Sequence, residues 1–567
     1  MLCYLILWPV VAAALGGNQT CKCFPWDSCW PSENEWNTLN TTVTGRLIKT
    51  VPLGSPCHDP NYNESLCNDL ASEWTYSPVH INSSSSVQAP IFANASCDPF
   101  TSEGSPCLFG NYVRYAVKAM GADDIAATIR FAEKHNIRLV IRNTAHDYMG
   151  RSTGAGGLAI WTHFLKDTQI KDWSDAEYTG KAIQIGAGIE GYEALDAAAA
   201  VGLVAVTGEC PTVGVAGGYV QNGGHSPLAT ALGLAADQTL EFEVVTANGE
   251  MVTASPFSNN SDLFWALSGS GAGNYGVVVS VTLKLHADAI TSGAAFVIEE
   301  LGLDYAAVLD AWHTALPGIL DAGNMATYYA TNTSMTLYSL TGYNRTKADL
   351  AIALAPVLSS FASMNVSVQP NYTSFDSYQD YYTYYFGPLP AGHFGAAGGS
   401  LIGGRFLLRD ALPDVGAAIN ASTLQIGGTF IGQAVNVSRF ESATRAVMPQ
   451  WRHAAVMSSY SLPYSFNVPF SEMKARQDRI TNEIMPKIEA VTPGAGAYIN
   501  EADYQQRDWQ DVFFGSNYDN LLMVKRKYDP KGLFWNPIAV GSEGWEILPD
   551  GRMCKTNFET LAGSTTG

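Results

Sequence analysis

The sequence predicts an α+β protein with more than one domain. Its length of 567 residues and its apolar content of 47% are enough to bury two cores of ordinary size. Between residues 113 and 286, segments with helical spacing of apolar residues alternate with short β-rich segments. After His286 the aromatic content increases, and helical and β-rich segments again alternate. We therefore expect one α+β domain at 108–289 and a second at 290–485.

The elements of the first domain can be predicted one by one. DDIAATIRFAEKHN has apolar residues at helical spacing, and the β-rich IRLVIRN follows it directly. KAIQIGAG predicts a strand and GIEGYEALDAAAAVG a helix. LEFEVVTANGEMV predicts a hairpin with Asn248-Gly249 at its turn, because Asn-Gly is favoured in tight hairpins. DLFWALSGS predicts a further helix and YGVVVSVTLKLH a long strand.

The second domain and the two ends of the chain have different patterns. AAVLDAWHTALPG predicts a helix and MATYYATN a strand of the second domain. Residues 17–107 are rich in Cys, Pro, Ser and Asn, and we expect an extension held by disulfides that carries little chemistry. Residues 486–567 contain a helical segment between proline-terminated ends.

The first residues, MLCYLILWPVVAAALGG, predict a signal peptide at 1–16, although no Lys or Arg precedes the apolar run. A membrane anchor is the alternative, but it needs about 18–20 apolar residues. We therefore expect a secreted, extracellular protein. Its N-glycans are predicted at Asn-x-Ser/Thr sites. These sites are Asn18, Asn40, Asn63, Asn82, Asn94, Asn259, Asn332, Asn344, Asn365, Asn371, Asn420 and Asn436.

The composition and the missing motifs exclude several functions. A net charge of −20 argues against nucleic acid and anionic membranes as partners. No G-x-x-x-x-G-K-[ST] or H-E-x-x-H sequence occurs, and neither a metal site nor the nucleophile elbow of an α/β-hydrolase is expected. GAGNYG at 271–276 matches G-x-G-x-x-G, but a helix precedes it and a strand follows, which is the reverse of the dinucleotide fingerprint. A tight turn is the preferred interpretation.

Cysteine parity singles out Cys210. Ten cysteines are present, and Cys3 lies in the predicted signal peptide. Eight of the others could form four disulfides. They are Cys21, Cys23, Cys29, Cys57, Cys67, Cys97, Cys107 and Cys554. The remaining one, Cys210, is buried and inert, paired between chains, or consumed by other chemistry.

Two segments indicate a polyanionic or flat ligand. In RLVIRNTAHDYMGRSTGAGG a strand enters a turn of small and polar residues whose backbone N–H groups could converge on phosphate oxygens. The alternative is a plain turn with a surface histidine. In GECPTVGVAGGYVQNGGHSPLA the many glycines leave space for a bulky group against the backbone. The alternative is a glycine-rich loop without chemistry.

Taken together, these segments resemble the berberine-bridge-enzyme-like FAD-linked oxidases of the vanillyl-alcohol-oxidase/p-cresol-methylhydroxylase superfamily. The resemblance extends over nearly all of residues 110–545 and includes DLFWALSGSGAGNYGVV, VMPQWRHA, AYINEAD and YDPKGLFWNP. It implies a two-part FAD-binding domain, completed by residues 486–567, with 290–485 as an inserted α+β substrate domain. Residues 17–107 are not covered in the same way.

The resemblance also implies the site. His146 and Cys210 stand where relatives bond the flavin at its 8α carbon and at ring carbon six, so the expected cofactor is bicovalent FAD. Asn222 replaces a frequent glycine, and Ala145 replaces another. Further implied flavin contacts are Arg142, Asn143, Thr144, Ala145, Asp147, Gly150, Ser152, Gly208, Thr212, Gly214, Gly217, Gly218, Asn222, Gly223, Gly224, His225, Val245, Asn500 and Asn536.

The expected function is that of an oxidase for a small-molecule substrate. Val213 stands at the position that gates oxygen in relatives, and a small residue there resembles members that reduce O2 to H2O2. Tyr498 and Tyr148 are candidate catalytic bases, although phenols have a pKa near 10. The substrate would be an alcohol, a carbohydrate or a secondary metabolite, and a monomer is expected. The alternatives are a dehydrogenase with another acceptor and a non-catalytic glycoprotein of this fold.

One aromatic run has two interpretations. SYQDYYTYYFGP, at 377–388, could line a substrate pocket together with His393 and Arg405. An ordinary aromatic strand is the preferred alternative.

Overall fold

The computed structural model describes residues 20–94, 96–299, 302–393 and 399–556. The expected signal peptide at 1–16 lies outside these residues. None of the helices in this described part combines the length and the apolar character that a membrane crossing requires.

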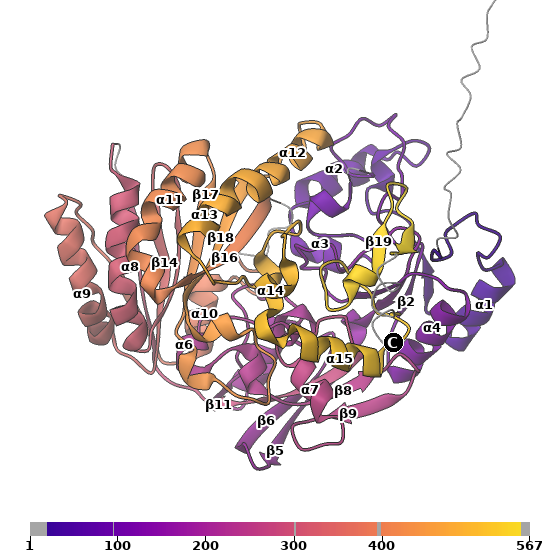
Figure 1. Ribbon diagram of the computed structural model, residues 1–567, viewed down its shortest axis with the longest axis horizontal. Helices are drawn as coiled ribbons and strands as arrows, with labels where there is room; N and C mark the ends of the chain where they lie inside the picture. The colour runs from indigo at the N-terminus through magenta and orange to yellow at the C-terminus, as the bar shows by residue number, and fades with distance from the viewer. Residues whose placement is uncertain (1–19, 95, 300–301, 394–398, 557–567) are drawn as a thin grey trace, which may run out of the picture.

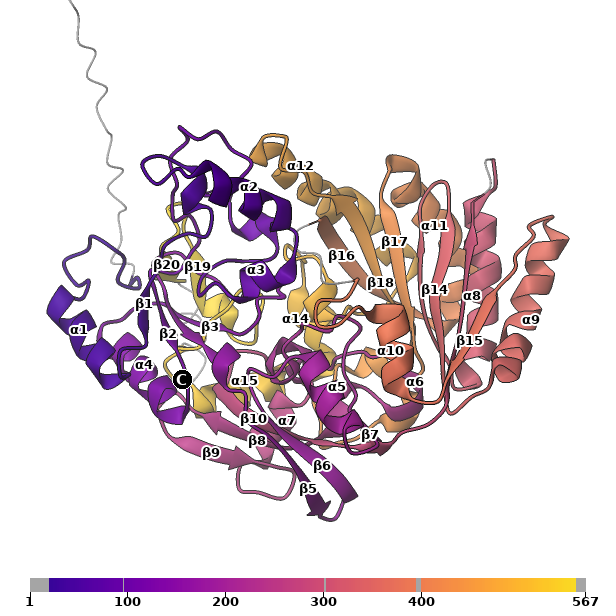
Figure 2. The same ribbon diagram turned by 180° about the vertical axis from the view of Figure 1, so that it is seen from behind.

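The chain first builds two small sheets, which lie side by side in the lower half of the molecule (Figures 1 and 2). One has the strand order β1-β2-β4-β3, with parallel pairing of β2, β4 and β3. The other is antiparallel in the order β5-β6-β10-β8-β9. The strands are β1 (Leu47–Lys49), β2 (Tyr115–Lys118), β3 (Leu139–Arg142), β4 (Leu158–Trp161), β5 (Thr168–Ser174), β6 (Thr179–Gly186), β8 (Thr239–Val245), β9 (Met251–Ala254) and β10 (Val277–Lys284).

Helix α4 (Ala122–Lys134) joins these two sheets into one core. Its residues Ile125 and Ile129 are fully buried and belong to the same apolar cluster as Phe242 and Val244 of β8. The spacing of four residues puts both isoleucines on one face of the helix. Burying an aliphatic side chain of this size contributes about 1.5–3 kcal/mol, so this face fixes the helix on the sheets.

Shorter elements connect the sheets and complete this part of the fold. Strands β7 (Leu203–Val204) and β11 (His286–Ala287) form an antiparallel pair. The helices are α5 (Gly191–Ala199), α6 (Ala229–Leu232), α7 (Ser261–Leu267), α14 (Trp509–Phe514) and α15 (Tyr518–Tyr528). Helices α14 and α15 come from the C-terminal end of the chain, yet they pack on the core built by residues 115–286.

The second half of the chain forms an antiparallel seven-stranded sheet with the order β15-β12-β14-β13-β17-β18-β16. Its strands are β12 (Thr291–Ile298), β13 (Met325–Ala330), β14 (Met335–Tyr343), β15 (Asn371–Phe375), β16 (Ser400–Leu408), β17 (Thr429–Ala434) and β18 (Ala454–Pro463). Five helices lie along one face (Figures 1 and 2). They are α8 (Tyr305–Asp321), α9 (Lys347–Ser363), α11 (Val415–Ser422), α12 (Phe470–Arg479) and α13 (Met485–Val491).

Alternation along the strands gives this sheet two different faces. In β17, Phe430 and Ala434 are fully buried against the helices, whereas Ile431 and Gln433 point to the opposite side. Successive side chains of a strand point to opposite faces, so a single strand can serve a core and a cavity at once. The face of Gln433 becomes one wall of the site described below.

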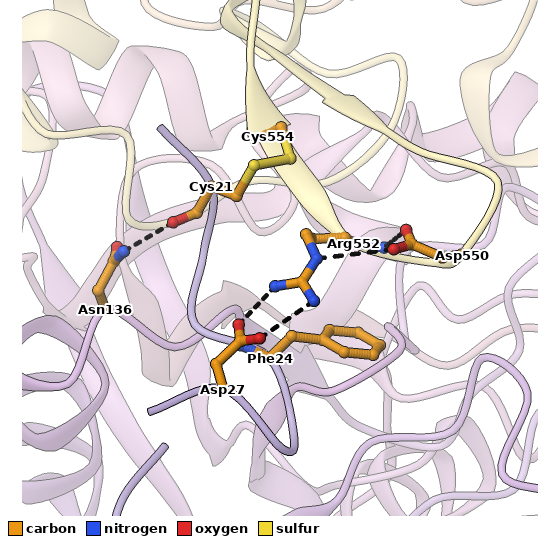
Figure 3. Close-up of a disulfide and its surroundings, with 7 residues drawn as sticks. All are labelled: Cys21, Phe24, Asp27, Asn136, Asp550, Arg552 and Cys554. Atoms are coloured by element: carbon orange, nitrogen blue, oxygen red, sulfur yellow. Dashed lines mark hydrogen bonds and ion pairs between the residues drawn. A yellow bond between two sulfur atoms is a disulfide. The ribbon is translucent and has the colours of Figure 1, made fainter. Parts of the chain in front are cut away.

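The N-terminal segment contains α1 (Glu33–Thr42), α2 (Glu64–Glu73) and α3 (Ser77–Ile81). Its disulfides are Cys23–Cys29, Cys57–Cys67 and Cys97–Cys107. A fourth disulfide, Cys21–Cys554, joins it to the C-terminal hairpin of β19 (Trp545–Ile547) and β20 (Met553–Lys555), as Figure 3 shows. The prediction of four disulfides that leave Cys210 free is confirmed.

An ion pair reinforces the same junction. The Arg552 guanidinium pairs with both oxygens of Asp27 and lies 5.0 Å from the centre of the Phe24 ring (Figure 3). On the other side, the Asn136 amide donates a hydrogen bond of 2.9 Å to the carbonyl oxygen of Cys21. The two ends of the described chain are therefore fastened to each other and to the end of α4.

The predicted α+β architecture is confirmed, and so are the helices and strands predicted for residues 122–286. The aromatic strand predicted at 377–388 is wrong, because this run forms α10 (Tyr378–Phe386). Tyr378, Tyr381, Tyr382 and Tyr385 recur at helical spacing and are buried in a core with Leu195 and Leu228. Arg405 is also buried and donates to Thr492, whereas His393 is exposed. None of these residues lines the large cavity, so the suggested aromatic pocket wall is wrong as well.

Candidate active site

A large cavity lies between the two small sheets and the open face of the seven-stranded sheet. Residues 139–152 and 208–225 supply most of the first wall, and Phe534, Trp535 and Asn536 extend it. Ser400, Ile402, Ile431, Gln433 and Ser459 supply the opposite wall from β16, β17 and β18. The cavity therefore joins both halves of the fold, and it contains most of the residues expected to contact FAD.

The turn after β3 presents His146. Asp147 organises this turn, because its carboxylate accepts hydrogen bonds from the backbone N–H groups of Met149 at 2.9 Å and Ser152 at 2.6 Å. Ala145 has a φ of 61°, which lies in the left-handed region that favours glycine. The replacement of the frequent glycine by Ala145 is therefore a strained change and not merely a mild one. The turn directs the His146 ring into the cavity.

The second glycine-rich segment presents Cys210 to the same point. Its Sγ atom lies 3.9 Å from Nε2 of His146 and 3.6 Å from Oγ1 of Thr212. Thr212 is itself hydrogen-bonded to His146 Nε2 at 2.7 Å. Two side chains from separate loops can thus reach one edge of a single ligand.

Burial keeps both of these side chains uncharged. It lowers the pKa of His146 to about 4, with a smaller contribution from His80. It raises the pKa of the Cys210 thiol to about 11. At neutral pH the imidazole therefore keeps a free lone pair and the sulfur stays protonated.

The N-terminal segment supports the His146 turn by hydrogen bonds, although none of its described residues lines the cavity. The Gln88 amide donates to the carbonyl oxygen of Thr144 at 2.9 Å. The buried Arg142 guanidinium turns away from the cavity and donates to the carbonyl oxygens of His80 and Ser83, both at 2.8 Å. The sequence could not predict this role, because the acceptors are backbone carbonyl oxygens and any residue type can supply them.

Asn222 and Asn500 link the glycine-rich loop to the C-terminal part. The Asn222 amide donates to Oδ1 of Asn500 at 2.7 Å. The Asn500 amide donates to the carbonyl oxygen of Gly218 at 2.7 Å and to the Tyr498 hydroxyl at 2.8 Å. The asparagine at 222 is therefore used as a tie between the two segments, a contact that glycine could not make.

The two candidate bases, Tyr498 and Tyr148, both line the cavity. Tyr498 is 3% exposed, and Tyr148 is 40% exposed. Burial raises the pKa of the Tyr498 phenol. The pKa of the Tyr148 phenol is also raised, because the cavity wall keeps water from its hydroxyl although its ring is partly exposed. The charge of Glu501 raises both pKa values further. A phenol with a raised pKa holds its proton at ordinary pH and is a poor proton acceptor.

Several expected contact residues shape the wall without lining it. They are Arg142, Gly150, Thr212, Gly223, Gly224 and Val245. Gly150, with φ of 71°, is closed off by the Phe92 ring, and Gly224, with φ of 72°, lies against Tyr219. Val245 is fully buried in the core of β8. The remaining expected residues, including Val213, Gly214, Gly217, Gly218, His225 and Asn536, line the cavity.

The GAGNYG segment forms a turn between α7 and β10, as interpreted from its context. Gly273 has a φ of 69°, and its carbonyl oxygen accepts a hydrogen bond from the Asn536 amide at 3.0 Å. Ala272, Gly273 and Gly276 line the cavity. This turn belongs to the site, although its sequence gave no role beyond a tight turn.

Sequence reasoning also missed Glu209, Glu501 and Gln433. Glu209 and Glu501 are adjacent to Cys210 and Asn500, so position next to a recognised residue was the available signal. Gln433 had none, because it comes from the other domain. All three line the cavity on the side of the seven-stranded sheet.

The residues present fit an FAD cofactor. The side-chain oxygens of Asn143, Gln221 and Asn536 line the cavity, are buried, and have no hydrogen-bond partner within the described chain. Unpaired buried acceptors are costly, so their arrangement points to a ligand with N–H or O–H donors. The glycines at 217 and 218 leave the backbone open beside these groups. His146 and Cys210 would hold the ring, and the turn at 143–152 would contact the remainder.

Comparisons with known proteins show the family of this chain. The family described as FAD binding domain matches residues 113–255, and the family described as berberine and berberine like matches residues 497–541. The FAD-linked oxidoreductase ZEB1 of Gibberella zeae is 48% identical over 543 residues, which cover 95% of this chain and 96% of that protein.

A solved relative has the same fold. The VAO-type flavoprotein oxidase VAO615 of Thermothelomyces thermophilus is 39% identical over 95% of this chain and 96% of its own length. The crystal structure of the VAO-type flavoprotein MtVAO615 from Myceliophthora thermophila C1 superposes with a TM-score of 0.90, at 37% identity. It covers 95% of this chain and 100% of that chain.

Proposed function

Since the chain belongs to the berberine-bridge-enzyme-like FAD-linked oxidoreductases of the vanillyl-alcohol-oxidase/p-cresol-methylhydroxylase superfamily, we propose that it is a secreted oxidase with bicovalently bound FAD. Its substrate is an alcohol, a carbohydrate or a secondary metabolite, and its second product is H2O2. The observation that carries this proposal is the pairing of His146 with Cys210 across one cavity, at 3.9 Å.

The chemistry of the two side chains supports a double attachment. Cys210 has no disulfide partner, although the eight other cysteines of the described chain are paired. His146 is neutral at ordinary pH, and its Nε2 atom is held by Thr212, so the ring has a fixed orientation. A covalent partner for the sulfur removes the hazard of a free thiol outside the cell.

When bound, FAD supplies the two-electron acceptor: an alcohol carbon loses its hydrogen with two electrons, the hydroxyl loses its proton, a carbonyl results, and O2 takes up two electrons and two protons as H2O2. The chain supplies orientation and exclusion of water. Val213 is a half-buried side chain on the cavity wall, which is compatible with the proposed role beside the path of O2.

Exposed glycosylation sites support secretion. Asn63, Asn82, Asn259, Asn332 and Asn371 are all exposed. Asn436 is less suited to carry a glycan, because it is half-buried and its amide donates to Asp321 at 3.0 Å. The disulfides fit the same oxidising environment.

The test is the colour of acid-precipitated protein together with a peroxide assay. Yellow colour that stays in the pellet is expected, together with one FAD mass that cross-links the peptide of His146 to the peptide of Cys210. Peroxide formed with one member of a panel of sugars, alcohols and phenols identifies the oxidase and its substrate class. A colourless protein contradicts the proposal, and flavin reduction without peroxide identifies a dehydrogenase.

A further inference from the structure

A cluster of buried polar side chains closes the cavity on the side of the seven-stranded sheet. We call it the carboxylate end, and it consists of Glu209, His225, Gln433, Ser459 and Glu501. The Glu209 carboxylate accepts hydrogen bonds from the Thr327 hydroxyl and from Gln433. His225 Nε2 lies 2.8 Å from Oε1 of Glu501. Strands β13 and β17 thus fix one carboxylate, and an imidazole fixes the other.

Three polar atoms at this end are still without a partner in the described chain. They are Nδ1 of His225, Oε1 of Gln433 and Oγ of Ser459. Their residues are only 7%, 7% and 4% exposed, and all three line the cavity. Buried polar atoms without partners cost free energy, so the carboxylate end is built to receive a ligand that carries hydroxyl groups.

The charges at this end are unbalanced toward negative. Burial raises the pKa of Glu209, and the charge of His225 opposes that shift only in part. Burial lowers the pKa of His225, but Glu501 and Glu209 outweigh it and the net pKa lies above its ordinary value. Arg151 is the one Lys or Arg among the described lining residues, and its guanidinium is turned to the carbonyl oxygen of Ile538. The His225 imidazole is already paired with Glu501, so an anionic substrate group would meet two carboxylates and no Lys or Arg side chain turned toward it.

We propose that Glu209 accepts the proton of a substrate hydroxyl, and that the carboxylate end admits neutral hydroxyl compounds and rejects carboxylates and phosphates. This inference rests on the proposed function. In the step, the substrate O–H bond breaks, its proton forms an O–H bond on Glu209, and the electron pair stays on the oxygen that becomes the carbonyl. The other electrons are accounted for by the cofactor chemistry stated above.

Glu209 is better suited to this role than the two tyrosines. It directly precedes Cys210, so it lies beside the point where the flavin would be fastened. The ordinary pKa of a carboxyl group lies far below that of a phenol, so a carboxylate can accept a proton at a pH at which the two tyrosines still hold theirs. Besides His225, Glu501 and the adjacent Cys210, the titratable groups around Glu209 are phenols. Burial raises the pKa of each phenol. They are Tyr219, Tyr338, Tyr378, Tyr381 and Tyr382.

The first test measures the absorbance of bound flavin against pH, without substrate. Wild-type protein is expected to show a transition above the ordinary carboxyl pKa of about 4.3, and Glu209→Gln to lose it. Glu209→Asp keeps the charge and should keep the transition. The control is Glu241→Gln, because Glu241 is a partly buried carboxyl of β8 outside the cavity with a pKa also raised by burial. A transition that persists in Glu209→Gln overturns the assignment.

The second test uses benzyl alcohol and 4-(hydroxymethyl)benzoate, which share the reacting group and differ by one carboxylate. Benzyl alcohol should perturb the flavin spectrum at lower concentration than the benzoate, and Glu209→Gln should slow anaerobic flavin reduction by about 10²–10⁴-fold. Equal or tighter binding of the benzoate, or no perturbation by either compound, contradicts the inference. If the wild-type protein carries FAD and forms peroxide, but Glu209→Gln reduces its flavin at the wild-type rate, only the role of Glu209 is refuted. Wild-type protein without FAD refutes the proposed function.

Discussion

The Cys210 sulfur lies 3.9 Å from Nε2 of His146, although 64 residues separate them in the chain. They meet because β3 ends at Arg142, just before the His146 turn, and because Thr212 hydrogen-bonds the imidazole from the Cys210 side. This pair defines where a flavin ring would be held. The arrangement allows the two attachments to be tested separately.

Cys210→Ala is expected to retain FAD through His146 alone, and His146→Ala to retain it through Cys210 alone. Each variant should turn over more slowly than wild type, and the double variant should release its flavin on acid precipitation. Peptide mapping by mass spectrometry measures the attachments. If a single variant still yields two peptides cross-linked through one flavin, the replaced residue is not an attachment point.

Gln88→Leu is expected to destabilise the protein by about 1–3 kcal/mol, since it leaves the Thr144 carbonyl oxygen unpaired and removes the acceptor of the Ser77 hydroxyl. The turn that carries His146 should loosen, so FAD attachment at His146 should fall while attachment at Cys210 persists. Denaturant unfolding and peptide mapping measure the two effects. Gln379→Leu is a matched control, because this glutamine donates to Asp196 at an exposed position and does not line the cavity. Equal loss at both attachment points would show a general folding defect instead.

Local chemistry decided what the sequence could predict. The helix at 122–134 and the hairpin around Asn248-Gly249 follow from spacing and turn residues alone, so they were predicted correctly. His146 and Cys210 were found because their motifs are continuous in the sequence. The aromatic run at 377–388 was misread from its β-forming composition, although tyrosines three and four residues apart were a helical signal.

The sequence predicted His225 as a flavin contact, but it could not predict that His225 gathers with Glu209, Gln433, Ser459 and Glu501 at one end of the cavity. Glu209 becomes a buried, partnered carboxyl only when Thr327 reaches it from 118 residues away, and Gln433 comes from a strand still further along the chain. A single glutamate in a loop carries no mark of such an environment. Burial and pKa are properties of the tertiary contacts, not of the residue type.

Buried histidines predict acid sensitivity. Burial lowers the pKa of His80 and His286 to about 4 and that of His313 to about 3. The unfolded chain, with histidine pKa values near 6.5, therefore binds more protons than the folded chain below that pH. The stability is fully present above about pH 6.5 and falls as the pH drops toward 4, by about 2 kcal/mol for each histidine at pH 5.

His313→Gln should reduce this pH dependence. The difference in Tm between pH 7 and pH 5 should be smaller in this variant than in wild type. Loss of the 2.7 Å contact with Tyr328 changes the Tm at both pH values and therefore does not affect this comparison. The exposed His453 offers the control His453→Gln, which should leave the difference unchanged. An undiminished difference in His313→Gln would mean that other groups cause the acid sensitivity.

The disulfide between Cys21 and Cys554 should contribute more stability than the disulfides that close short loops, because its own loop spans 533 residues. Constraining the unfolded chain over so long a loop stabilises the folded state by up to about 5 kcal/mol, against about 3 kcal/mol for the separation of 10 residues at Cys57–Cys67. Replacing both Cys21 and Cys554 by Ser should therefore lower the free energy of unfolding more than the same change at Cys57 and Cys67. Denaturant unfolding of the two variants makes the comparison. The ion pair of Arg552 with Asp27 remains in the Cys21/Cys554 variant and acts only in the folded state. If this variant loses less free energy of unfolding than the Cys57/Cys67 variant, the unfolded chain keeps its two ends together without the disulfide.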